Sequence, residues 1–122
     1  MQVARRNFDN TPWRHVALDF DFTGAAPGDV LWAALLRYHP FSVTVEPDEV
    51  QGWKGSLQVL VSNRVTIPHG TDYPTLGDQA TGPMSVMYDA PFQWIGVQLI
   101  TNDSGLISVH VVGSPYARNI QP

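Results

Sequence analysis

Hydrophobic and polar residues alternate one by one along several short stretches of the chain, which is the pattern of half-buried β-strands. The clearest case is 15–22, where four apolar side chains share one face while Asp19 and Asp21 share the other. Groups of glycine, proline, asparagine and aspartate separate these stretches, as turns would. The pattern predicts an all-β, antiparallel β-sandwich, jelly-roll-like, with about seven or eight strands. The other alternating stretches are 41–46, 57–62, 84–88, 92–100 and 106–112.

Three further segments are less regular. Residues 30–38 form a continuous apolar run, which fits either a buried strand or a helix capped by Asp29, and both interpretations stay open. Residues 69–83 hold the longest series of turn-forming residues and predict a loop or a loosely paired edge. The turn-forming tetrad 102–105 lies between two alternating stretches, so 92–100 and 106–112 are expected to pair as a hairpin.

The domain organisation follows from where the alternation begins and ends. The 122 residues fit one domain. We expect an extended N-terminal arm over 1–14, a sandwich domain over 15–113 and a C-terminal tail over 114–122. Phe8 and Trp13 are large apolar groups on the otherwise polar arm, so they either anchor it to a neighbouring protein or pack against their own domain.

Composition narrows the class of partner. Charged residues make up 15% of the chain, against about 25% in an average globular protein, which suggests that partners cover part of the surface. The net charge of -4 argues against nucleic-acid binding. No apolar run reaches the length of a membrane span, and the N-terminus lacks the apolar core of a secretory signal. We therefore expect neither nucleic acid nor a membrane among the partners.

Residues that carry chemistry are scattered along the sequence. Asp19 and Asp21 share a strand face, which fits a solvated surface better than a catalytic pair. No cysteine is present, and the metal, phosphate-loop and nucleophile patterns are absent. We predict no catalytic residue, no metal site and no cofactor, and therefore no enzyme. The four histidines lack the spacing of a metal or catalytic motif: His15, His39, His69 and His110.

One loop motivates a different class of function. Asp48 and Glu49 precede Trp53 in the turn-rich stretch 47–55. An aromatic face beside carboxylates can stack on a sugar ring, so these three residues are candidate glycan-binding residues of a carbohydrate-binding module. The alternative is that Trp53 caps the hydrophobic core, where Trp32 and Trp94 are also expected.

The second half of the chain resembles the small β-sandwich virion proteins of tailed phages. The resemblance begins with Ser56-Leu-Gln-Val-Leu-Val-Ser62-Asn63, which is followed by the turn-rich stretch 69–83. It continues with a strand ending at Asp89, a strand that begins Phe92-Gln-Trp-Ile-Gly, and a final strand after Ser104-Gly105. It covers about residues 41–113. The sequence departs from the family at 63–65, which lacks the usual Asn-Asp-Gly turn, and at Gln98, where an arginine is often found.

This resemblance implies a non-enzymatic structural protein of the virion, assembled in the host cytoplasm. A capsid decoration (cement) protein is the leading hypothesis, and a tail or baseplate accessory protein or a carbohydrate-binding module is the alternative. The implied partners are the major capsid protein or other virion subunits and further copies of the chain, as a homotrimer. A small jelly-roll hydrolase or isomerase is a weaker alternative. The candidate interface residues are Arg5, Arg6, Phe8, Trp13 and Tyr73.

Overall fold

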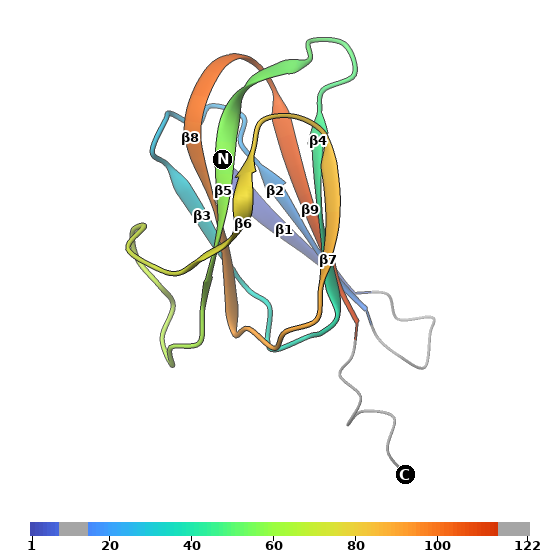
Figure 1. Cartoon of the computed structure of the whole chain (residues 1–122), viewed down its shortest axis with the longest axis vertical. Coiled ribbons are helices and arrows are strands. Elements are labelled where there is room, and N and C mark those ends of the chain that lie inside the picture. Colours follow the sequence, from blue (N-terminus) through green and yellow to red (C-terminus); the bar gives the residue numbers. More distant parts are fainter. Residues whose placement is uncertain (8–14, 115–122) are drawn as a thin grey trace.

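The chain folds into two antiparallel β-sheets packed face to face (Figure 1). The computed structural model describes residues 1–7 and 15–114, without the side chains of Arg6 and Asn7. This part of the chain forms nine strands and no helix, which confirms the predicted all-β sandwich, and so no helix in it can cross a membrane. The strands are β1 (Gln2–Asn7), β2 (Val16–Asp21), β3 (Val30–Ala34), β4 (Phe41–Pro47), β5 (Trp53–Ser62), β6 (Thr75–Ala80), β7 (Met84–Tyr88), β8 (Trp94–Gly105) and β9 (Ile107–Gly113).

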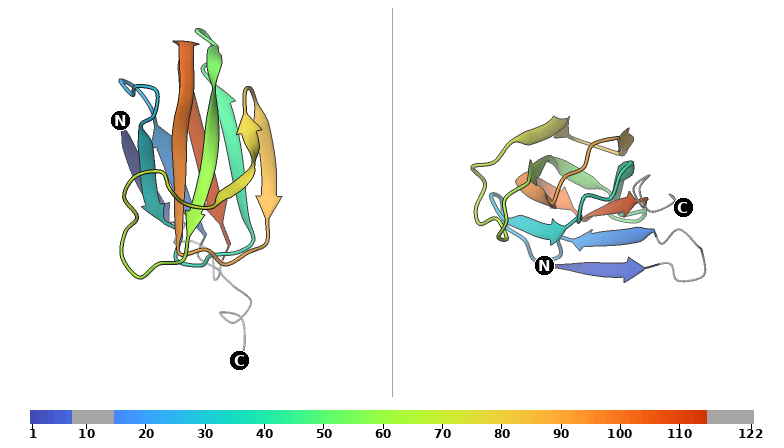
Figure 2. Two further views of the ribbon diagram at one scale, coloured as in Figure 1. Left: turned by 60° about the vertical axis from the view of Figure 1, so that its left-hand side comes forward. Right: turned by 90° about the horizontal axis from the view of Figure 1, so that it is seen from below.

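The strand order is that of a jelly roll with one added strand. Sheet A has the order β1-β2-β9-β4-β7, and sheet B has the order β3-β8-β5-β6 (Figure 2). The pairs β2–β9, β3–β8, β4–β7 and β5–β6 are nested within one another along the chain, so that two four-stranded sheets result. β1 extends sheet A beyond β2.

The core lies between the sheets and consists of the apolar sets that the alternation predicts. Leu18, Phe20, Val43, Val97 and Val109 point inward from four strands, and none is more than 1% exposed. At about 25 cal/mol per Å² of apolar surface, burial of each such side chain contributes about 2 kcal/mol. This shared interior holds the two sheets together.

The N-terminal arm differs from the prediction. Gln2–Asn7 pair with Val16–Asp21 along their whole length, so residues 2–7 belong to the sandwich as the edge strand β1. The sequence QVARRN shows no apolar alternation, because most of the stabilisation of an edge strand comes from backbone hydrogen bonds to its neighbour. The predicted boundary at residue 15 is therefore wrong for this segment, and residues 8–14 lie outside the described part.

The open question over 30–38 is resolved in favour of a strand. Val30–Ala34 form β3, paired with β8. The chain then turns through Leu36 and Arg37, whose φ angles are 54° and 60°, a region that residues with a side chain rarely adopt. The backbone N–H groups of these two residues donate to the carbonyls of Gln93 and Phe92, which hold the turn in place.

The predicted hairpin of 92–100 with 106–112 is wrong. β8 pairs with β5 and β3 in sheet B, whereas β9 pairs with β2 and β4 in sheet A. The chain crosses between the sheets at Gly105, where φ is 83° and a Cβ would lie 2.0 Å from the carbonyl oxygen of Gly52. Both the backbone conformation and the lack of space therefore require glycine at this position. In the sequence, a glycine that links two sheets looks the same as a glycine in a hairpin turn.

Two further elements differ in extent. The stretch 69–83 contains β6, an irregular edge strand, in agreement with the loosely paired edge that was one of its two interpretations. β5 begins at Trp53, earlier than the alternation indicates, and it reaches past two register shifts against β8. Bulges of this kind break the strict period of two on which the prediction depends.

Candidate functional site

The outer face of sheet B is covered by the chain itself. Residues 63–74, here called the covering loop, connect β5 to β6 and sweep across the front of sheet B (Figure 2). Leu60 points away from the core toward this loop and yet is only 1% exposed. The indole of Trp32 lies on the backbone of Gly96, where a Cβ would approach the ring to 2.7 Å. The sandwich therefore has a small second apolar cluster outside sheet B.

Both partly buried tryptophans of this face hold the covering loop by hydrogen bonds. Trp32 Nε1 donates to the carbonyl of Gly70, and Trp94 Nε1 donates to the carbonyl of Arg64, each at 3.0 Å. The N–H of Gln93 donates to Asn63 Oδ1 at 2.7 Å. These two tryptophans were expected in the main core; instead they fasten a loop to the outside of a sheet.

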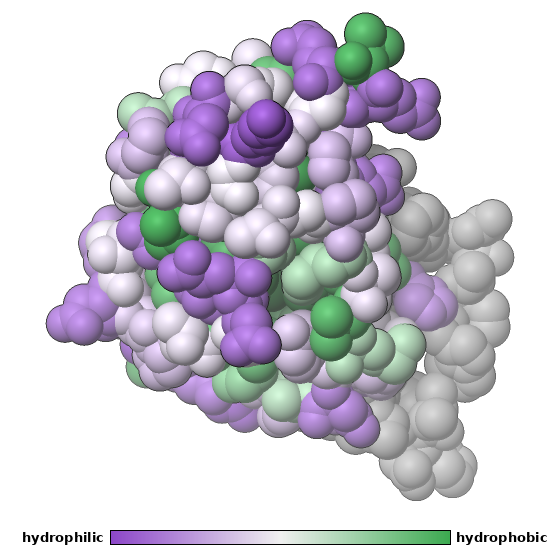
Figure 3. Space-filling model, turned by 45° about the horizontal axis from the view of Figure 1, so that its top comes forward, coloured by the Kyte–Doolittle hydropathy of each residue, from purple (hydrophilic) through white to green (hydrophobic). Residues whose placement is uncertain are grey.

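Tyr73 was a candidate interface residue, but the structure gives its side chain an internal role. Its ring meets Trp32 edge to face, with 5.1 Å between the ring centroids. Its hydroxyl accepts hydrogen bonds from Arg64 Nη1 and from the backbone N–H of His69. Figure 3 shows the molecule with its top turned toward the viewer, and on this side hydrophobic residues are scattered among polar ones. Tyr73 stabilises the covering loop and is not a free anchor.

The candidate glycan site is not assembled as a sugar platform. Trp53 is only 9% exposed, and its Nε1 donates to Asn102 Oδ1 at 3.0 Å. Asp48 Oδ2 accepts the backbone N–H groups of Val50 and Gln51, so this carboxylate organises the turn after β4. Glu49 is exposed beside it. Trp53 thus caps the core, as its alternative interpretation stated, and its ring does not offer a face to a ligand.

The remaining candidate interface residues come from the N-terminal segment. Arg5 Nη1 donates to the carbonyl of Ala34 on β3 at 2.6 Å, so this side chain joins the edges of the two sheets. Arg6 has a described backbone on β1 only, and Phe8 and Trp13 lie outside the described residues. Arg5 and Tyr73, the two candidates with described side chains, therefore both make contacts within the sandwich itself.

The outer face of sheet A has no covering loop among the described segments. A row without charged residues crosses its last three strands, where Val112 of β9 lies opposite Ser42 of β4 and Ser42 opposite Met87 of β7. Met87 is 70% exposed and Val112 is 36% exposed. Ala17 continues the row on β2 but is buried, so the uncovered part begins at Val112. Apolar side chains exposed on adjacent strands are typical of contact surfaces.

Polar contacts occupy the rest of this face. In the next row, His110 Nδ1 lies 2.7 Å from Asp19 Oδ1. In the same row, the hydroxyls of Thr44 and Ser85 are 3.0 Å apart. Asp21 Oδ1 accepts the backbone N–H of Thr23, and this hydrogen bond holds the pKa of the carboxyl below its ordinary value of 3.8. As expected, Asp19 and Asp21 belong to a solvated face. No group of three metal-ligating side chains occurs among residues 1–7 and 15–114.

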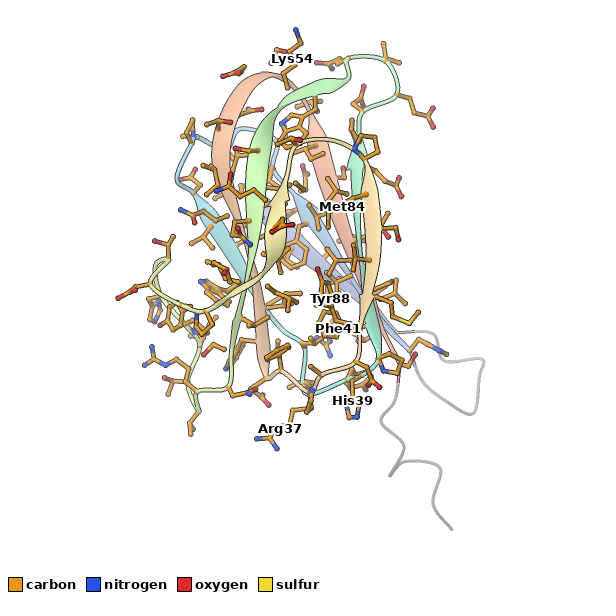
Figure 4. All side chains as sticks on the ribbon, in the orientation of Figure 1. Arg37, His39, Phe41, Lys54, Met84 and Tyr88 are labelled. Carbon is orange, nitrogen blue, oxygen red and sulfur yellow. The ribbon has the colours of Figure 1, made fainter. Side chains whose placement is uncertain are left out.

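β7 forms the outer edge of sheet A. Figure 4 shows Met84 and Tyr88 on this strand and Phe41 on the neighbouring β4. The rings of Phe41 and Tyr88 are 5.6 Å apart, so the inner side of β7 packs on the core. Val86 lies between Met84 and Tyr88 and points to the same inner side of β7, yet it is 38% exposed. The strand is thus anchored at both ends of its inner side and exposed at its centre.

The comparisons with known proteins give distant likenesses only. No protein-family model matches the sequence, and no curated protein matches it significantly. One similar solved structure is a Bacillus endospore appendage, described as belonging to a novel family of disulfide-linked pili: 10% identity, TM-score 0.42, covering 95% of this chain and 93% of that one. Another is a cupin 2 domain-containing protein from Halorhodospira halophila: 15% identity, TM-score 0.36, covering 95% of this chain and 71% of that one. Similarities at this level assign neither a family nor a function.

Proposed function

We propose that this protein is a non-enzymatic structural subunit that attaches to a larger protein assembly through the outer face of sheet A. The assembly that the sequence resemblance suggests is a tailed-phage virion, with a capsid decoration protein as the leading role and a tail or baseplate accessory protein as the alternative. The jelly-roll order itself does not decide among these roles, because viral capsid proteins, lectins and cupins share it.

The observation that supports the proposal is the uncharged row on sheet A. Val112 and Met87 remain exposed there although the chain covers the comparable residues of sheet B. Ser42, between them, adds a small polar group without a charge. A rigid sheet that offers such a row loses little conformational entropy on binding, because its side chains are already ordered by their strands. When the same weak contact is repeated many times on one particle, the overall binding is strengthened by multivalency.

Binding to a glycan receives less support from the contacts. Trp53, the residue that motivated it, is buried against its own domain. Trp32 and Tyr73 are engaged with each other and with the covering loop. A protein partner on sheet A is therefore the better proposal.

The test is co-sedimentation of the purified protein with virions or capsids that lack it. We expect the wild-type chain to sediment with the particles and the Val112→Asp variant to lose at least about tenfold in affinity, because a carboxylate would be desolvated in the contact. The matched control is Val65→Asp, which places the same charge on a 95% exposed valine of the covering loop. Equal binding by Val112→Asp and the wild type would refute attachment through this face.

A measurement without mutations tests the location. Mass spectrometry of purified particles is expected to find the protein in a fixed copy number per particle. Its absence from particles of every kind would contradict the virion role and leave the contact surface to be tested with another assembly.

A further inference from the structure

The sandwich has four edge strands, and three of them carry features that prevent pairing with another chain. β1 carries Arg5 and Arg6 on consecutive positions, and charges on an edge strand disfavour pairing. At the end of β3, the carbonyl of Ala34 is occupied by Arg5. β6 is irregular: Gly77 has a φ of 71°, and its carbonyl accepts a hydrogen bond from Gln58 Nε2 at 3.1 Å. Natural sheets use such charges, bulges and occupied groups to avoid edge-to-edge association.

β7 has none of these features. Its sequence, Met-Ser-Val-Met-Tyr, contains no charge, proline or glycine. Its backbone pairs with β4 on one side, and its remaining N–H and C=O groups bond to no other described backbone group. Figures 1 and 2 both show its other side as the outer boundary of sheet A. Met87 and Val86 are 70% and 38% exposed along this edge.

We propose that β7 is a docking edge for β7 of a second copy of this chain, which joins two A sheets into one antiparallel ten-stranded sheet. Backbone hydrogen bonds along an exposed edge provide affinity, and alternate side chains provide register. A two-fold axis at Val86 places the two Val86 residues opposite each other, Ser85 opposite Met87 of the partner copy and Met84 opposite Tyr88 of the partner copy.

The charge distribution favours β7 of a second copy, rather than one of the other edge strands, as the strand that pairs with β7. Within β7 no like charges meet, because the strand is neutral along its whole length. Asp89 follows the strand at one end only, so in the antiparallel arrangement the two Asp89 side chains lie at opposite ends of the contact. The core contacts of Tyr88 fix the strand before it binds, which lowers the entropic cost of pairing.

The contact is short, so we expect a reversible dimer. Five paired residues a side fall at the small end of specific interfaces, roughly below 1,200 Å² in total. Analytical ultracentrifugation over a wide concentration range should show a monomer–dimer equilibrium. Hydrogen–deuterium exchange should show β7 amides that become protected as concentration rises, while amides of β1 and β6 stay unchanged.

One pair of variants tests the register. Val86→Lys places two lysines opposite each other across the axis and should weaken dimerisation by about tenfold or more. Val86→Glu should do the same alone, whereas a mixture of the two variants should form a one-to-one dimer at least as strong as that of the wild type. The control is Val65→Lys, which adds the same charge at a 95% exposed position and should dimerise normally.

Three results would overturn the proposal. A wild-type chain that stays monomeric at every concentration refutes it, and so does a Val86→Lys variant that dimerises like the wild type. A dimer that is lost with Val112→Asp but not with Val86→Lys shows face-to-face association instead. Because dimerisation is measured on the free protein, its failure is distinguishable from a failure of particle binding.

Discussion

The two sheets of this sandwich share a core, but outward-pointing apolar residues are buried on sheet B and exposed on sheet A. On sheet B, Leu60 points outward and is 1% exposed, because the covering loop and Trp32 lie over it. On sheet A, Val112 also points outward and is 36% exposed, and Met87 beside it is 70% exposed. Alternation along a strand cannot distinguish these cases, since each residue is merely on the non-core side. What decides is whether a loop of the same chain returns across the face.

This difference separates residues that stabilise the fold from residues that are available to partners. Tryptophans are common binding residues, yet here Trp32 and Trp94 hold the chain to itself. Among the described residues, those that sheet A offers to a partner are less conspicuous: a valine, a methionine and a neutral edge strand. Mutations that compare the two faces should therefore change stability on sheet B and association on sheet A.

The largest stability difference is expected between Leu60→Ala and Val112→Ala. Removal of the buried Leu60 side chain leaves a cavity under the covering loop and should cost about 2–4 kcal/mol of unfolding free energy. The same truncation at the partly exposed Val112 should cost less than about 1 kcal/mol. Urea unfolding followed by circular dichroism measures both values. Equal losses would show that the covering loop does not act as a second core.

Gly96→Ala tests the contact between Trp32 and the sheet. A Cβ at this position would lie 2.7–2.9 Å from three ring carbons of Trp32, so the indole must move and the covering loop with it. We expect a cost of about 1–3 kcal/mol, as for other overpacked sites, together with a change in tryptophan fluorescence. Gly82→Ala is the matched control, because nothing lies within 4 Å of where its Cβ would be and its φ lies outside the left-handed region. A fluorescence spectrum unchanged by Gly96→Ala would contradict the stacked arrangement.

Much of sheet A and of the core could be predicted from the sequence. β2, β4 and β9 follow the period of two closely, because their inner faces are buried in a single layer. β1 could not be predicted, since an edge strand such as QVARRN has no apolar face to mark it. The crossing at Gly105 was also invisible, because a tight link between two sheets uses the same residues as a hairpin turn.

The candidate sites were less predictable than the fold. Tyr73 and Arg5 belong to residue types that are enriched in interfaces, but partners distant in the sequence, Trp32 and Ala34, engage them within the domain. The engagement of Arg5 depends on β1 and β3 lying at adjacent edges, which no local pattern encodes. Trp53 was correctly given an alternative as a core cap, and the hydrogen bond to Asn102 shows how a distant strand completes it.

Trp94→Phe should have a smaller effect than Leu60→Ala and Gly96→Ala. It keeps an aromatic ring but removes the Nε1–H that donates to the carbonyl of Arg64. The lost hydrogen bond should cost about 1 kcal/mol. Hydrogen–deuterium exchange in the covering loop should accelerate, while exchange in β9 stays as in the wild type. Uniform acceleration across both sheets would indicate that the loop and the core unfold as one unit.

The smallest expected effect belongs to the uncovered face and concerns pH. The hydrogen bond from the N–H of Thr23 lowers the pKa of Asp21 in the folded chain relative to 3.8. A carboxyl with a lowered folded-state pKa binds its proton more readily when unfolded, so its stabilisation is present above about pH 4 and is lost as pH falls through the folded pKa. Asp21 is exposed to solvent, which screens the interaction and keeps it weak.

Asp21→Asn should therefore flatten the acid limb of the stability curve slightly, through a small loss of stability above about pH 4 and none near pH 2.5, because the neutral amide lacks the charge that the Thr23 N–H stabilises. Thermal unfolding between pH 2.5 and pH 6 measures this, with Asp103→Asn, at an exposed position of β8, as the control for loss of one negative charge. If Asp21→Asn lowered stability strongly at neutral pH, the uncovered face would hold a cooperative polar network, and the contrast with sheet B would have to be drawn differently.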